Sequence, residues 1–182
     1  MSSILKVDEI QNTDGKTGLV ITPDGSIDGI KFPEEANPSG RTITSTTMSS
    51  YEEGSWTPVL ETGTALTLYG RYTKVGNLVT FTVVANRIEN RTAPDRINFS
   101  LPFSAASTIN NAVISEALIF AAIRYVTLDE DYYSVYGNIG GSASDLNLFQ
   151  QGDYKDTVPL RHDQLTSVYN WIRLSGSYYT DE

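Results

Sequence analysis

The feature that most constrains the fold of this chain is the alternation of its side chains over short stretches. LVTFTVVA, residues 78–85, alternates β-branched and aromatic side chains, and INFSLPF, residues 97–103, places Ile97, Phe99 and Leu101 on one face. A period of two is typical of a strand with one buried face. Turn signals recur about every ten residues, a spacing that favours an antiparallel all-β fold.

Two further stretches extend this pattern. The KVGN turn, residues 74–77, lies between RYT and LVTF and predicts a hairpin. The last stretch, residues 168–180, predicts two faces, with Val168, Asn170, Ile172 and Leu174 on one side and Tyr169, Trp171 and Arg173 on the other. We therefore expect residues 51–182 to form an antiparallel β-sandwich of jelly-roll-like form.

One stretch within this domain leaves two structures open. The alanines and leucine of NAVISEALIFAAIR, residues 111–124, would tolerate a helix. Its larger apolar residues form no clean helical stripe: Val113, Ile114, Ile119, Phe120 and Ile123. We favour a pair of strands over a helix.

The first part of the chain has a different organisation. Residues 1–32 carry three short apolar pieces, and both connections between them contain Asp-Gly, which is typical of tight turns. Strands this short cannot bury a core alone, so the segment is expected to attach to something larger. Residues 33–50 are rich in Pro, Ser, Thr and Gly and predict a linker. We expect the attachment to involve the apolar side chains Ile4, Leu5, Val7, Ile10, Leu19 and Ile21.

The charge balance excludes two classes of partner. Thirteen Lys and Arg residues face 22 Asp and Glu residues, which gives a formal net charge of −9. Binding to nucleic-acid phosphates or to an anionic membrane surface requires clusters of basic residues. The N-terminus shows no secretory signal, and the most apolar run, residues 112–123, is too short to span a bilayer. We expect a protein made in a cytoplasm, with no nucleic-acid partner and no membrane insertion.

Residues that could perform chemistry are sparse. His162 is the single histidine, and its neighbour Asp163 would point to the opposite face of a strand, so we expect a surface or interface histidine. The acid groups at residues 52–53 and 129–131 are expected to be solvated turn residues. The chain has no cysteine, no phosphate-binding glycine motif and no calcium-loop pattern. The sequence therefore predicts no catalytic residue, no metal and no cofactor.

Aromatic residues are the remaining candidates for binding. The chain has 11 tyrosines and two tryptophans, and aromatic rings bind partners well because they bury much area at little entropic cost. In a strand, one member of each tyrosine doublet must face away from the core. Our candidates for contact with a partner are therefore Tyr132, Tyr133, Tyr178 and Tyr179.

Other aromatic residues, prolines and glycines are expected to shape the domain. Trp56, Phe81 and Phe99 are interpreted as core residues, and Pro58 is expected to end a strand or to keep it at an edge. Within GRYTKVGN, residues 70–77, the expected packing and turn residues are Gly70, Tyr72, Gly76 and Asn77.

Several of these stretches resemble one family. Residues 3–27, SILKVDEIQNTDGKTGLVITPDGSI, resemble the opening of tailed-phage fibre and virion-appendage proteins, above all those of cyanophages. YEEGSWTP, GRYTKVGNLVTFTV, INFSLPF and the closing IRLSGSYYT are similar to the C-terminal β-domain of such fibres. The order of these pieces is more specific than any one of them, and residues 104–165 carry little of the pattern.

The resemblance implies a non-enzymatic, homotrimeric virion protein, assembled in the host bacterial cytoplasm. Its N-terminal part would attach to other virion proteins, and its β-domain would face a glycan or protein on the host cell surface. A short tail fibre or adhesin is favoured, and a head or neck fibre or a capsid decoration protein stays open. A remote alternative is a polysaccharide depolymerase, which would need two carboxylates placed across a sugar bond.

Overall fold

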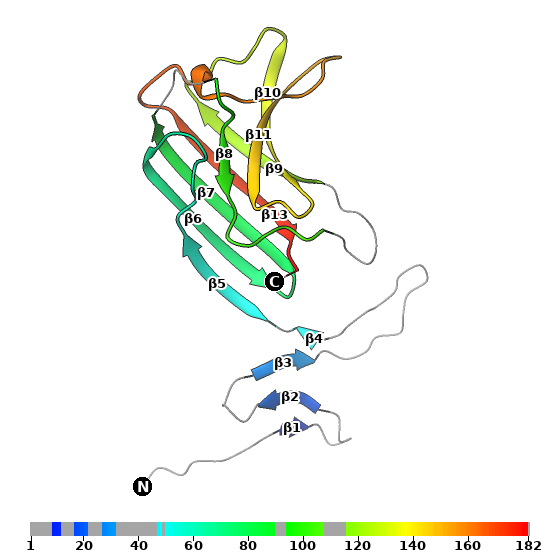
Figure 1. Cartoon of the computed structure of the whole chain (residues 1–182). Helices are drawn as coiled ribbons and strands as arrows, with labels where there is room; N and C mark the ends of the chain where they lie inside the picture. Colours follow the sequence, from blue (N-terminus) through cyan, green and yellow to red (C-terminus); the bar gives the residue numbers. More distant parts are fainter. Residues whose placement is uncertain are drawn as a thin grey trace. The chain divides into compact units, whose positions relative to one another are not determined.

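The computed structural model describes residues 9–11, 17–21, 27–31, 47–48, 50–89, 94–107 and 116–181. The chain divides into two compact units, Met1–Glu52 and Glu53–Glu182, and the boundary falls inside strand β5 (Tyr51–Trp56). Figure 1 traces both units. Nearly all of their regular structure is β-strand, with a single turn of 3-10 helix, η1 (His162–Gln164), in the described part.

The first unit is a four-stranded antiparallel meander. Its strands follow one another in the order β1 (Glu9–Gln11), β2 (Thr17–Ile21), β3 (Ile27–Lys31) and β4 (Thr47–Met48). Ile10 pairs with Leu19, and Ile30 pairs with Met48. Residues 47–48 thus form a strand, where the composition predicted only a linker, because they complete the ladder of β3. Ile4, Leu5 and Val7 lie outside the described residues.

The second unit is one nine-stranded antiparallel sheet. Its path runs β12-β11-β10-β9-β13-β7-β6-β5, and β8 pairs with β11 beside β12. The strands are β6 (Ala65–Val75), β7 (Leu78–Ile88), β8 (Asn98–Ser100), β9 (Glu116–Arg124), β10 (Tyr132–Gly140), β11 (Asp145–Gly152), β12 (Val158–Pro159) and β13 (Trp171–Tyr179).

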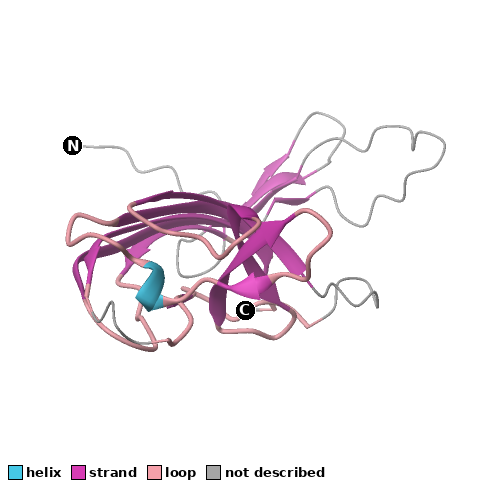
Figure 2. Cartoon of the chain, turned by 90° about the horizontal axis from the view of Figure 1, so that it is seen from above, coloured by secondary structure: helices cyan, strands magenta, loops and turns pink. Residues whose placement is uncertain are grey.

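The sheet curls so that its two halves enclose one core (Figure 2). Alternate residues of the interior strands are buried, such as Val79, Phe81 and Val83 of β7. They pack in one cluster with Phe99 of β8 and Leu146 of β11, although β7 and β11 are far apart in the strand order. Burial of such side chains stabilises the domain by about 1.5–3 kcal/mol each.

Strand β13 joins the two halves of this sheet. It lies between β7 and β9 and is antiparallel to both, with Ile172 paired to Ala85 on one side and to Ile123 on the other. Its buried side chains include Ile172 and Leu174, on the face that the alternation predicted. Val168, which was predicted on that face, precedes the strand and is exposed.

The all-β prediction is confirmed, with antiparallel pairing throughout the described strands. The strands of the second unit belong to one continuous curled sheet, and the jelly-roll form and the trimer stay predictions. Residues 116–124 form strand β9, so the choice of strand over helix is confirmed for them, and residues 111–115 of the predicted pair lie outside the described residues.

The predicted packing residues form an aromatic cluster on the inner side of β5, β6 and β7. The Trp56 ring lies 6.1 Å from that of Tyr72 and 6.2 Å from that of Phe81, and its Nε1 donates to the Ser100 carbonyl at 3.1 Å. A Cβ on Gly70 would lie 2.5 Å from the Trp56 ring. Gly70 therefore admits the tryptophan ring, in agreement with the packing role predicted for it.

The KVGN hairpin forms as predicted. Val75 pairs with Leu78, and the two-residue turn begins at Gly76 with a φ of 57°, a region that favours glycine. Asn77 completes this turn, and its carbonyl accepts a hydrogen bond from the amide of Thr180. Pro58 follows the end of β5, which is an edge strand, in agreement with the role predicted for it.

Candidate functional site

The candidate surface is the outer face of the curled sheet, which points away from the core. Register places Thr82 of β7 beside Ser175 of β13, and Ser175 beside Phe120 of β9. The same row continues to Tyr136 of β10 and then to Phe149 of β11. One line of side chains thus crosses five neighbouring strands and changes from hydroxyl groups to aromatic rings.

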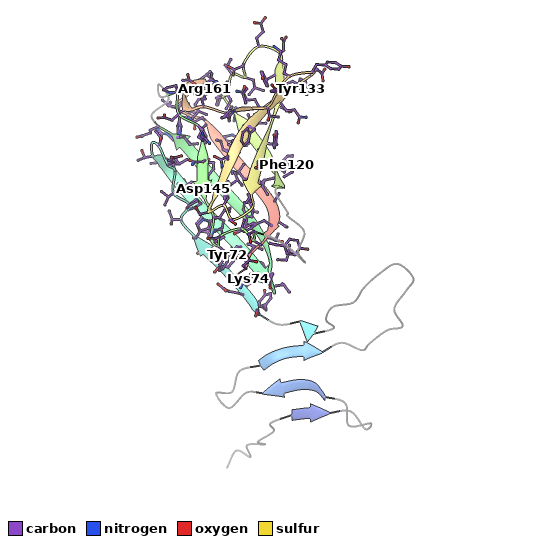
Figure 3. The ribbon with its side chains drawn as sticks, turned by 45° about the vertical axis from the view of Figure 1, so that its right-hand side comes forward. Tyr72, Lys74, Phe120, Tyr133, Asp145 and Arg161 are labelled. Carbon is purple, nitrogen blue, oxygen red and sulfur yellow. The ribbon has the colours of Figure 1, made fainter. Side chains whose placement is uncertain are left out.

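The aromatic half of this row is unusually exposed for an interior strand. Phe120 is 72% exposed and Leu118, two residues earlier on β9, is 70% exposed. Tyr136 and Phe149 stack beside them, with ring centroids 5.9 Å apart and an interplanar angle of 23°. We call Leu118, Phe120, Tyr136 and Phe149 the aromatic row; Phe120 can be followed in Figure 3. Contiguous exposed apolar groups of this kind mark interaction surfaces.

A second group, at another place on this face, combines arginines with aromatic rings. The guanidinium of Arg124 lies 4.7 Å from the Tyr125 ring centroid, and that of Arg173 lies 5.3 Å from the Trp171 ring centroid. Arg87 lies 5.7 Å from the Tyr169 ring centroid. We call these six residues the arginine–aromatic group. Such contacts hold a guanidinium flat against a ring.

The first tyrosine doublet lies at the start of β10. Tyr133, which is labelled in Figure 3, is 62% exposed, whereas Tyr132 is half-buried. The hydroxyl of Tyr133 donates to Asp153 Oδ1 at 2.7 Å, and this hydrogen bond raises the pKa of Tyr133. The hydroxyl of Tyr132 donates to the carbonyl of Asp156 at 2.8 Å. Tyr133 is the outward member of this pair.

In the second doublet, Tyr178 is buried and Tyr179 is exposed, so one of the two candidates has to be corrected. Tyr178 is only 3% exposed; its ring packs 5.8 Å from that of Phe81, and its hydroxyl donates to the carbonyl of Phe103 at 2.8 Å. The prediction of Tyr178 as a contact residue is therefore wrong, because its register opposite Val79 turns it into the core. Tyr179 is the outward member and stays a candidate.

The acidic turn predicted at residues 129–131 contains one carboxylate that is fully engaged. Arg161 donates to both oxygens of Asp129 at 3.2 Å, and the side chains of Gln150 and Gln164 donate to it as well. The Arg161 guanidinium holds the pKa of Asp129 below its ordinary value. This carboxylate is thus a fixed structural anion, and the lowered pKa opposes a role as general acid. Asp131 lies 2.7 Å from the Lys155 ammonium group.

His162 is not a surface residue, and that prediction is wrong. It begins the 3-10 turn η1, which directs its ring inward, and it is fully buried. Neither ring nitrogen has a hydrogen-bond partner within the described residues. Desolvation lowers the pKa of His162, against weaker opposing effects of the Glu89 backbone and the Asp95 and Asp163 carboxylates. The ring is therefore a neutral core group.

Two other kinds of site are absent from the described residues. Their His, Asp and Glu side chains form no group of three that could hold a metal ion. They also contain no helix that is long and apolar enough to cross a membrane.

The sequence reasoning missed both the aromatic row and the arginine–aromatic group. Leu118 and Phe120 lie between inward residues such as Ile119, so an apolar run hid their outward direction. Strand alternation separates Leu118 and Phe120 from Ile119, but it does not say which of the two faces is outward.

Comparisons with known proteins add no identification. No protein-family model, curated protein or solved structure matches the chain.

Proposed function

We propose that this chain is a non-enzymatic virion structural protein, a short homotrimeric tail fibre that attaches by its N-terminal unit and presents its β-domain to the host surface. The observation that carries the proposal is the aromatic row. Exposed Leu118 and Phe120 on an interior strand are the groups that a second copy of the chain would cover.

Charge supports self-association at this row. Each copy carries a net charge of −9, so two copies repel one another wherever acidic surfaces meet. The aromatic row itself contains no charged residue, and hydroxyl groups of Thr82 and Ser175 continue it across the sheet. A contact at this row removes apolar area from water without bringing carboxylates together.

The ends of the β-domain support its role in contact. A Cβ on Gly54 of β5 would lie 2.8 Å from the hydroxyl of Tyr72, so the chain enters the domain near the Val75–Leu78 hairpin. The strands then run to the opposite end, where Trp171 pairs with Arg124. β6 alone has 11 residues and extends over roughly 35 Å. The opposite end is therefore far from the point where the N-terminal unit joins.

The self-association is tested by mass measurement with light scattering on the purified chain. We expect three chain masses of 20.0 kDa for the wild type and one for Phe120→Asp, with an unchanged far-UV circular dichroism spectrum. Val59→Asp is the matched control, because Val59 is also exposed but lies outside the sheet strands. A wild-type monomer at micromolar concentration contradicts the proposal.

The attachment role is tested by removing residues 1–40. The remaining chain should fold, because the sheet and core of the second unit lie within residues 51–182, and it should no longer join the particle. Incorporation at normal occupancy would overturn the attachment role. A map of the whole particle would then show whether the chain lies on the tail, the neck or the capsid.

A further inference from the structure

Three strands bring the arginine–aromatic group together at one end of the outer face. Trp171 of β13 pairs with Arg124 of β9 on one side and with Asn86 of β7 on the other. Arg173 lies two residues further along β13, and Arg87 directly follows Asn86. Strands are spaced about 4.8 Å apart and residues i and i+2 about 7 Å, so the three arginines share a small area.

The arginines are fixed in place before any ligand arrives. Energetically significant cation–π contacts occur about once per 70–80 residues, whereas three gather here at one end of one face. Arg173 also donates from Nη1 to Asn86 Oδ1 at 2.9 Å. A guanidinium stacked on a ring keeps its N–H edges available for two parallel bonds to an anionic group.

The backbone supports this arrangement with two strained residues. Arg87 has a φ of 53° and Tyr125 a φ of 59°, which side-chain-bearing residues rarely adopt. At Arg87 the left-handed conformation interrupts the alternation, because Ala85 and Ile88 are both buried. Such conformations cost about 1–3 kcal/mol and persist where the surrounding structure holds them, commonly at binding sites.

Charge indicates what this group binds. The chain has only 13 basic residues, yet Arg87, Arg124 and Arg173 have no carboxylate partner within the described residues. Three unneutralised cations together in an acidic chain are complementary to a ligand with several anionic groups. Tyr125, Tyr169 and half-buried Trp171 add ring surface beside them.

Three classes of polyanion meet this description, and the fold discriminates among them. Duplex nucleic acid is disfavoured because it carries a phosphate charge about every 1.7 Å along its whole length, and a net charge of −9 repels this dense charge outside the small area of the three arginines. An acidic polypeptide would gain affinity by adding a strand at a sheet edge, but β7, β13 and β9 are interior strands. A polysaccharide needs neither a free edge nor an apolar pocket, since its rings lie on aromatic surface and its acid groups meet the arginines.

We propose that the arginine–aromatic group binds an acidic polysaccharide through its carboxylate or sulfate groups. The inference rests on the proposed function only for the source of the ligand, the host surface. It goes beyond that function because it names the chemistry of the ligand and a place on the domain that contains neither Tyr133 nor Tyr179.

The experiment measures binding of the purified full-length chain to two pairs of polymers by calorimetry at low salt. One pair is polygalacturonate and its neutral methyl ester; the other is dextran sulfate and neutral dextran. We expect binding to at least one charged polymer and to neither neutral one, weakening as salt increases. The charged polymer that binds more tightly identifies carboxylate or sulfate as the preferred group. Absence of binding to both charged polymers would overturn the proposal.

Variants assign the binding to these residues. Arg173→Gln and Arg124→Gln should each weaken binding about tenfold, and the double variant more, because each removes a charge-assisted pair of hydrogen bonds. Arg71→Gln, on the same face but paired to Thr82 in another row, is the control and should retain the wild-type affinity. Thermal melts establish that every variant is folded. Equal losses in Arg71→Gln would overturn the assignment.

Two further measurements separate the outcomes. Poly-glutamate that binds as tightly as the charged polysaccharides would overturn the choice of a polysaccharide in favour of an acidic polypeptide. A trimer that binds no acidic polymer refutes this inference and leaves the proposed assembly intact. A monomer that binds one refutes the assembly and supports the inference.

Discussion

Replacing Gly70 by alanine should destabilise the wild-type chain but stabilise a chain in which Trp56 has been replaced by alanine. The added Cβ would lie 2.5, 2.5 and 2.6 Å from three atoms of the Trp56 ring, all far inside ordinary contact distance. The ring cannot tilt freely, because its Nε1 donates to the Ser100 carbonyl and it packs against the rings of Tyr72 and Phe81. Overpacking of this kind costs about 1–3 kcal/mol.

A second effect of the same substitution acts in the opposite direction. Gly70 does not have a positive φ, so alanine fits its backbone conformation and stabilises a strand by about 0.5–1 kcal/mol relative to glycine. The net expectation is a destabilisation of up to about 2.5 kcal/mol in the wild-type background. In a Trp56→Ala background the ring is gone, and Gly70→Ala should then stabilise by about 0.5–1 kcal/mol.

Urea unfolding of the full chain, followed by far-UV circular dichroism, measures all four members of this cycle. The coupling between the two positions should equal the overpacking cost, about 1–3 kcal/mol. Trp171 remains as a fluorescence probe in every variant. An equal loss of stability from Gly70→Ala in both backgrounds would refute the reasoning, since it would place the strain in the backbone and not against the ring.

Two other predictions concern buried polar groups. Burial lowers the pKa of His162 below 6.5, so the unfolded chain binds the proton at a higher pH than the folded chain, and the free energy of unfolding should fall as pH decreases from about 6.5, by at most about 1.4 kcal/mol per pH unit. His162→Leu should flatten this pH dependence between pH 5 and 6.5 in denaturant titrations. An unchanged slope would contradict the assignment. Asn170→Ala should lower the free energy of unfolding by about 2–5 kcal/mol, because the Asn170 side chain bonds both the N–H and the carbonyl of buried Ile88, at 2.8 and 3.0 Å. Thr80→Ala, which removes an exposed hydroxyl–hydroxyl hydrogen bond, should cost under about 0.5 kcal/mol. Equal losses in the two variants would show that the buried Asn170 bonds contribute no more to stability than an exposed one.

Local patterns predicted the strands better than their arrangement. Alternation in residues 78–85 and the glycine of the KVGN turn act over a few residues, so the β6–β7 hairpin could be predicted directly from the sequence. The position of β13 between β7 and β9 depends on pairing with residues about 50–100 positions away, which no local pattern encodes. The order of the strands in the sheet could therefore not be predicted from local sequence patterns.

The buried face of a strand could be predicted only where its two faces differ in polarity. Tyr178 and Tyr179 are identical side chains, and the pairing of Tyr178 with Val79 decides which one is buried. Within β9, Leu118, Ile119 and Phe120 are all apolar, so no contrast marks the outward members. His162 was misplaced because the prediction treated His162 and Asp163 as neighbours in a strand, whereas the short turn η1 rotates the histidine inward.

The place of β13 in the sheet also determines when the protein can complete its fold during synthesis. The ribosome makes β13 after every strand that it joins, so β7 and β9 leave the ribosome with open edges and an incomplete core. Until that last strand arrives, each open edge can recruit the β13 of a neighbouring chain on the same message, which makes exchanged strands the characteristic error of synthesis. A nascent chain halted before Trp171 is consequently expected to be a target for chaperones and proteases, and the sheet is expected to close only after β13 has been synthesised.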